Sequence, residues 1–146
     1  MSRFVRKSHN VSVLLYHAVC PTKYRRALLT EEVDAVLRDV CLEIGERYEI
    51  EFIEIGADRN HVHFLVQSVP TYSPSKIVQT IKSITAREIK TRLPWVKEQL
   101  WGSAFWSAGY FINTVGSQGT EDMIRRYVAS QGQDYKQLHV QQLVLF

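Results

Sequence analysis

Apolar residues recur along this chain with two different periods, which indicate strands and helices respectively. Runs of β-forming residues occupy 11–19, 50–55, 60–66 and 105–115, the last of them interrupted by Gly109. Turn-forming residues at 56–60 separate the second run from the third, as in an antiparallel hairpin. The pattern therefore predicts four strands, with the middle two joined as a hairpin.

Helical spacing of apolar residues fills much of the chain between and after these strands. Thr30 can cap a helix, and apolar residues recur at helical spacing from Val33 to Ile44. A second helix is predicted from Ser75 to about residue 93, because Pro94 would end it. A third begins at Thr120 and has Gly132 as a stop. The pattern after residue 132 is too weak to assign an element.

The predicted order is strand, helix, two strands, helix and strand, followed by the helix that begins at Thr120. It matches the split βαβ plan of ferredoxin-like (RRM-like) domains, an α+β fold with an antiparallel sheet and helices on one face. Val62, Phe64 and Val66 would face the helices, and His61 and His63 would lie on the open face of the sheet. We expect one domain over 1–146, with its core at about 11–131 and a short tail at 132–146.

Composition narrows the class of protein only slightly. The chain has 146 residues, a net charge of +3 and a sequence pI near 8.9, which permit a nucleic-acid partner without requiring one. Cys20 and Cys41 lie in apolar surroundings and lack metal-site spacing, so we expect them to be reduced core residues. We find neither a signal peptide nor a membrane-spanning segment and expect a cytoplasmic protein.

The segment His61-Val62-His63 is the first candidate for chemistry. Side chains alternate along a strand, so both imidazoles point to the same face and could hold a divalent cation if a third ligand is supplied from elsewhere. Two histidines at this spacing can also occur by coincidence on a solvated face. The pair alone therefore leaves the choice open.

The predicted third helix offers a possible nucleophile and ligand. Met123, Tyr127 and Gln131 recur every four residues and share one face of that helix. A tyrosine can form a covalent intermediate with phosphate, so Tyr127 and Gln131 could supply a nucleophile and a third metal ligand together. Spacing alone does not choose among the seven tyrosines, and Tyr135 is the nearest competitor.

Basic residues gather in two places that could contact DNA. The first patch follows the first strand and consists of Lys23, Tyr24, Arg25 and Arg26. The second is the helix predicted at 75–93, which carries Lys76, Lys82 and Arg87 among its five cations. Either set could equally be an ordinary solvated surface. The aromatic residues at 95–111 are attributed mostly to core packing.

Five landmarks in this order resemble the single-tyrosine HUH transposases of bacterial and archaeal insertion sequences, the group typified by insertion sequence two hundred, to which REP-associated tyrosine transposases are related. The resemblance covers roughly residues 16–131. The landmarks read TKYRR from Thr22, HVHFLV from His61, SPSK from Ser73, WSAGYF from Trp106, and IRRY from Ile124 followed by Gln131. A His-x-His motif alone is weak, whereas the five together are highly specific.

The resemblance implies a metal-dependent DNA strand transferase that cuts and rejoins single-stranded DNA at the ends of a mobile element. It implies that Tyr127 forms a 5′-phosphotyrosine link and that His61, His63 and Gln131 ligate Mg²⁺ or Mn²⁺. It also implies a homodimer, with active sites that the two subunits can share, acting on DNA with hairpin ends. The residue before the first histidine is often aspartate in this family and is Asn60 here, which removes a negative charge near the metal.

Other readings are compatible with these residues. A domesticated relative would keep the chemistry but act on chromosomal repeat hairpins. A non-catalytic single-stranded nucleic-acid-binding module would not need Tyr127. A metal phosphoesterase that uses water would release free ends instead of a covalent adduct.

Overall fold

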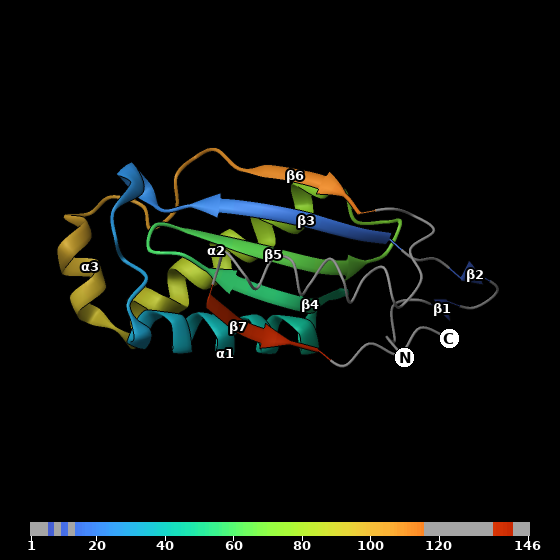
Figure 1. Ribbon diagram of the computed structural model, residues 1–146, viewed down its shortest axis with the longest axis horizontal. Coiled ribbons are helices and arrows are strands. Elements are labelled where there is room, and N and C mark those ends of the chain that lie inside the picture. The colour runs from blue at the N-terminus through green and yellow to red at the C-terminus, as the bar shows by residue number, and fades with distance from the viewer. Residues whose placement is uncertain (1–5, 8–9, 12–13, 116–135, 142–146) are drawn as a thin grey trace.

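The computed structural model describes residues 6–7, 10–11, 14–115 and 136–141, and its centre is a five-stranded antiparallel sheet (Figure 1). The order across the sheet is β6-β3-β5-β4-β7. The bounds of these strands are β3 Leu14–Pro21, β4 Ile50–Ala57, β5 His61–Ser68, β6 Phe111–Thr114 and β7 Lys136–Val140. A separate short pair joins β1 (Arg6–Lys7) to β2 (Asn10–Val11).

Two long helices, α1 (Glu31–Arg47) and α2 (Pro74–Arg92), pack on one face of the sheet, behind it in Figure 1. Both have a side-chain cap. Thr30 Oγ1 accepts a hydrogen bond from the backbone N–H of Val33 at 3.3 Å, and Ser73 Oγ accepts one from that of Lys76 at 3.0 Å. A short helix, η1 (Lys23–Arg25), precedes α1, and another, α3 (Pro94–Leu100), follows α2.

The core lies between the helices and the sheet. As predicted, Val62, Phe64 and Val66 of β5 are fully buried in it. They pack with apolar residues that α1 and α2 present at helical spacing, including Leu37, Ile44, Ile77 and Ile81. The expected α+β, ferredoxin-like plan is therefore confirmed, and the alternation along β5 sends His61 and His63 to the opposite face.

That opposite face is less open than predicted. Leu15, Ile53, Leu65 and Gln67 are no more than 3% exposed, and His63 is only 4% exposed. The prediction overlooked the apolar residues that alternate with polar ones on this face, since Leu15 and Leu65 occupy the same side as the histidines. Apolar side chains on this face stabilise the fold when they are buried away from water, so their presence indicates a covered face.

Several predicted boundaries were wrong for local reasons. Gly56 and Ala57 belong to β4, so the turn before β5 contains only residues 58–60. Pro94 ends α2 but also begins α3, because proline suits the first turn of a helix. The last predicted strand shrinks to β6. Residues 136–140, which the pattern left unassigned, form β7 along β4.

None of the described helices combines the length and the apolar character needed to cross a membrane. The helix predicted from Thr120, with Tyr127 and Gln131, lies outside the described residues.

Candidate active site

His61 and His63 lie at the beginning of β5, where the strand is held on both sides. β3 pairs with β5 so that Pro21 is opposite His61 and Val19 is opposite His63. β4 pairs on the other side, with Gly56 opposite His63. The ring centroids of His61 and His63 are 5.7 Å apart. The hairpin therefore brings the two imidazoles together on one face, as the sequence predicted.

The structure adds a third histidine that sequence analysis did not single out. Nε2 of His17, on β3, lies 2.7 Å from Nδ1 of His63, within hydrogen-bond distance. His17 shares the histidine face because it alternates with the core residues Tyr16 and Ala18. That alternation was visible in the sequence, but the neighbouring of β3 and β5 was needed to connect His17 with His63.

Asn60 holds the other histidine. Its Oδ1 lies 2.9 Å from Nδ1 of His61. An amide oxygen can only accept a hydrogen bond, so Nδ1 of His61 carries the proton in this contact, and the tautomer with that N–H has its lone pair on Nε2. Asn60 thus fixes the tautomer in which Nε2 can bind a metal ion, without being a ligand itself.

Burial favours the neutral form of His63 and of His17. Desolvation by burial, with smaller contributions in the same direction from the neighbouring His17 and His61, lowers the pKa of His63 to about 4. Burial also lowers the pKa of His17. Neutral imidazole is the form that binds metal ions, so His63 keeps that form well below neutral pH.

These features fit a divalent metal ion at His61 and His63. Histidines that bind metals characteristically engage their second ring nitrogen in a hydrogen bond, and Nδ1 does so in both residues. Two imidazoles do not complete a site. Within the described part of the chain, no three His, Cys, Asp or Glu residues are grouped to hold a metal ion. A further ligand has to come from another residue type or another segment, and the predicted ligand Gln131 lies outside the described residues.

The first basic patch lies directly beside this site. The backbone N–H of Thr22 donates to the carbonyl oxygen of Asn60 at 2.9 Å, and Thr22 Oγ1 donates to the same oxygen at 3.1 Å. Thr22 is directly followed by η1, which contains Lys23, Tyr24 and Arg25. Nη1 of Arg26 donates to the carbonyl oxygen of Gln99 at 2.6 Å, so this guanidinium also joins the turn to α3.

The predicted cations of α2 are dispersed and do not converge on the histidines. Lys76 is exposed, and its Nζ lies 4.4 Å from the ring centroid of Tyr72. Lys82 Nζ donates to the carbonyl oxygen of Ser107 at 2.6 Å, toward the β6 edge of the sheet. Contact of either lysine with DNA stays a prediction.

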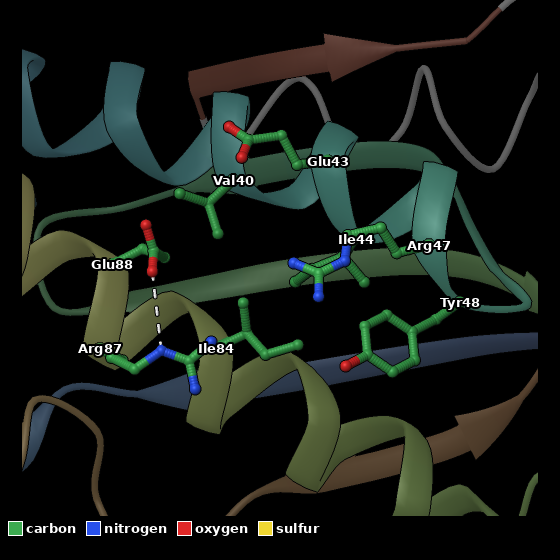
Figure 2. Close-up of a pocket in the computed structure, with 8 residues that line it drawn as sticks. All are labelled: Val40, Glu43, Ile44, Arg47, Tyr48, Ile84, Arg87 and Glu88. Carbon is green, nitrogen blue, oxygen red and sulfur yellow. Dashed lines mark ion pairs between the residues drawn. The ribbon is translucent and has the colours of Figure 1, made fainter.

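Arg87 lies elsewhere, in a pocket between α1 and α2. Figure 2 shows it beside Glu88, with Arg47 and Tyr48 of the neighbouring segment across the pocket. Its Nε lies 3.6 Å from a carboxylate oxygen of Glu88. α1 and α2 cover the face of the sheet opposite the histidines. Arg87 therefore lies on the other side of the sheet from the histidine site, and its contact with DNA stays a prediction.

The aromatic segment divides into buried and exposed residues. Phe105 and Trp106 are core residues, as predicted, and Nε1 of Trp106 donates to Oγ1 of Thr85 at 2.9 Å. Trp101, by contrast, is 88% exposed, and Phe111 is 56% exposed. Attributing the segment mainly to core packing was therefore wrong for these two, because composition alone does not show which aromatic residues face the core.

Comparison with known proteins points to one family. The family model described as "Transposase IS200 like" matches residues 10–131. The ISDra2 transposase TnpA of Deinococcus radiodurans is 34% identical over 118 residues, which cover 81% of this chain and 84% of that protein.

Two solved structures are also similar. A crystal structure of a chain assigned as a transposase from Deinococcus radiodurans R1 has a TM-score of 0.62 and 27% identity, covering 86% of this chain and 96% of that one. A REP-associated tyrosine transposase bound to a REP hairpin has a TM-score of 0.51 and 16% identity, covering 90% of this chain and 70% of that one, and shares the fold. The family match, the identity to the Deinococcus protein and the shared architecture place this chain in the family of IS200-like transposases.

Proposed function

We propose that this transposase cuts and rejoins single-stranded DNA at the ends of an insertion sequence through a covalent bond to Tyr127. Membership of the family supports a DNA-cutting enzyme. The observation that carries the finer proposal is the pair of imidazoles at the beginning of β5, each with Nδ1 engaged in a hydrogen bond. That arrangement suits metal-assisted phosphate chemistry and has no evident role in packing the core.

The proposed cleavage is a single displacement at phosphorus. The phenol oxygen of Tyr127 forms a bond to phosphorus while the bond from phosphorus to the 3′ oxygen breaks. The proton lost by the phenol is balanced by the proton gained at the released 3′-hydroxyl. The 5′ phosphate stays on the tyrosine, so an incoming 3′-hydroxyl can reverse the step and reseal the strand without ATP.

His61, His63 and Gln131 would hold Mg²⁺ or Mn²⁺ in this proposal. The bound ion would polarise the phosphate and stabilise the charge that develops on its oxygens. The described residues contribute the orientation of the ligands: Asn60 fixes the ring of His61, and His17 contacts that of His63. We assign Gln131 as the third protein ligand because the resemblance to the family implies it, and its place one helical turn from Tyr127 in the predicted third helix is compatible with that role.

The proposed substrate is single-stranded DNA with hairpin ends, and the proposed assembly is a homodimer. A structurally similar REP-associated tyrosine transposase is bound to a REP hairpin, which supports a hairpin as the first substrate to test. The basic patch at η1 supports contact with DNA near the histidines, because it is hydrogen bonded to Asn60 through Thr22. Lys23 and Arg26 would meet the phosphates there, and contact of Arg25 with DNA stays a prediction from the sequence.

The test is incubation with Mn²⁺ and a labelled hairpin oligonucleotide with single-stranded flanks, followed by a denaturing gel. We expect a shifted band that protease removes. Tyr127→Phe should abolish this band, whereas Tyr135→Phe, the matched control, should keep it. Cleaved DNA without a protein adduct would instead indicate a phosphoesterase that uses water. Binding without cleavage in any metal would indicate a nucleic-acid-binding module.

A further inference from the structure

Two aromatic residues, Tyr24 and Trp101, combine an unusual backbone with an unusual exposure. They are the only non-glycine residues in the described part of the chain with positive φ, at 55° and 50°. They are also the most exposed large hydrophobic residues there, at 73% and 88%. Positive φ is uncommon for a bulky residue, and so is high exposure of a large ring. Tyr24 and Trp101 each combine the two.

Burial in the core accounts for neither side chain. A left-handed backbone favours glycine or asparagine, and an aromatic ring in solvent gains nothing from burial. Trp101 is the C-terminal cap of α3, a position that often has positive φ but usually holds glycine, and it is followed by Gly102 with a φ of 80°. Strained positions of this kind concentrate at binding sites, where the side chain that they display has a use.

The two rings belong to loops that are connected to one another and to the histidine site. Arg26, two residues after Tyr24, donates to the carbonyl oxygen of Gln99, two residues before Trp101. The backbone N–H of Lys23 donates to the carbonyl oxygen of Phe105 at 2.8 Å. Figure 1 shows η1 and α3 at the same end of the sheet, the end at which β5 begins with His61.

Cations surround Tyr24 in particular. Nζ of Lys23 lies 5.1 Å from the centroid of its ring, and the guanidinium carbon of Arg26 lies 6.0 Å from it. Exposed rings beside cations are the combination with which proteins bind single-stranded nucleic acid, since rings stack on bases and cations meet phosphates. A protein partner would be expected to bury these rings in an apolar surface, and the basic surroundings favour the nucleic acid.

We propose that Tyr24 and Trp101 form a stacking surface that holds unpaired bases of single-stranded DNA next to the histidine site. The proposal deepens the proposed function and rests on it for the identity of the ligand. It changes the role expected for Tyr24, which would contact a base while its neighbours contact phosphates. It also adds Trp101, a residue that the basic patches did not include.

The test uses glycine, which tolerates positive φ and removes only the ring. Binding of a fluorescent, unpaired oligothymidine to the full-length chain would be measured by anisotropy without metal, so that cleavage does not contribute. We expect Tyr24→Gly and Trp101→Gly each to weaken binding about tenfold, as the loss of one stacked base would do. Tyr24→Phe and Trp101→Phe, which keep a ring, should stay within about twofold.

Salt dependence and thermal unfolding separate stacking from other causes. The rings carry no charge, so the slope of log affinity against log salt should be unchanged in the glycine variants. A slope that becomes shallower by about one unit would mean that a phosphate-binding cation was displaced, and it would overturn the stacking role. Both glycine variants should unfold at or above the wild-type temperature; if either unfolds earlier, Tyr24→Asn and Trp101→Asn replace them in the same assay.

Affinity that stays within twofold in all ring-deleting variants would overturn the proposal. This outcome is distinguishable from failure of the proposed function. If wild-type protein forms no Tyr127 adduct, strand transfer is contradicted. The affinities measured without metal would still show whether the two rings bind DNA. If only the stacking proposal fails, wild-type protein forms the adduct and the glycine variants bind DNA as tightly as wild type does.

Discussion

At the scale of single residues, the site depends on hydrogen bonds that orient the two imidazoles. The sequence identified His61 and His63 because strand alternation places them on the same face. It did not identify His17, since its role arises from the pairing of β3 with β5. Asn60 was noticed only as a departure from a family pattern, whereas the structure gives it a contact with Nδ1 of His61. Contacts between strands are what a linear pattern conveys least well.

The contact from Asn60 predicts the effect of its removal on metal binding. Asn60→Ala removes the acceptor that orients the Nδ1–H of His61, so we expect Mn²⁺ affinity to fall about tenfold or more. Asn60→Asp keeps the acceptor and adds a negative charge, and it should bind Mn²⁺ at least as tightly as wild type. Isothermal titration calorimetry checks both. Equal affinity in Asn60→Ala and wild type would show that the amide does not position the ligand.

A second prediction concerns Asp34, a buried carboxyl on α1. Burial and, to a smaller extent, Glu31 raise its pKa to about 6, against the opposing attraction of Lys136, whose Nζ lies 3.7 Å from Oδ2. The folded state therefore binds a proton more tightly than the unfolded chain. The resulting stability is fully present below pH 4 and is lost as the pH rises through about 6.

After allowance for solvent screening, that loss amounts to about 2 kcal/mol. Asp34→Asn cannot ionise, so its unfolding free energy should lack this decline between pH 4 and 7. Urea unfolding of the two proteins across that range measures the difference. Parallel pH profiles would contradict the assignment to Asp34.

At the scale of elements, the central strand β5 carries both the core and the site. Its two faces follow from simple alternation, which is why the hairpin, the core residues and the histidines were predictable together. The ends of elements were less predictable. Pro94 both ends one helix and begins another, and β7 has only Leu138 packed against the core, so its apolar pattern was too weak to detect.

The contact between Thr85 and Trp106 predicts how α2 holds the segment after α3. Both residues are buried, and Thr85 Oγ1 accepts the indole N–H. Thr85→Val keeps the shape but leaves that N–H without an acceptor, so we expect a loss of about 1–3 kcal/mol in unfolding free energy. In a Trp106→Phe background, which has no indole N–H, the same change should cost clearly less. An equal cost in both backgrounds would show that the hydrogen bond contributes little.

At the scale of the whole molecule, the proposed site needs residues that are far apart in the sequence. His61 and His63 lie at one end of the central strand, whereas Tyr127 and Gln131 fall in the sequence between β6 and β7, the two edge strands of the sheet. Helical spacing left Tyr127 and Gln131 as one possible partner of the histidines among several. The resemblance to the family is what assigned all four residues to one site. In the proposed homodimer, Tyr127 of either subunit could act at a given pair of histidines.

The proposed assembly makes a prediction about mixed proteins. Light scattering should give a mass twice the 16.9 kDa of one chain. If subunits share active sites, a mixture of His61→Ala and Tyr127→Phe proteins should recover adduct formation that neither has alone, after exchange of subunits. A monomer in solution would contradict the shared site. A dimer whose mixtures stay inactive would show that each chain completes its own site.

The central claim is that Tyr127 attacks DNA and keeps the 5′ phosphate. The most direct measurement uses one oligonucleotide labelled at either its 5′ or its 3′ end, followed by peptide sequencing of the adduct by mass spectrometry. Cleavage after Arg126 and Lys136 gives one peptide that contains both Tyr127 and Tyr135, so fragmentation has to distinguish them. We predict that the 3′ label stays with the protein, the 5′-labelled fragment leaves with a 3′-hydroxyl, and the phosphate maps to Tyr127. Retention of the 5′ label, or a phosphate on Tyr135, would contradict the account.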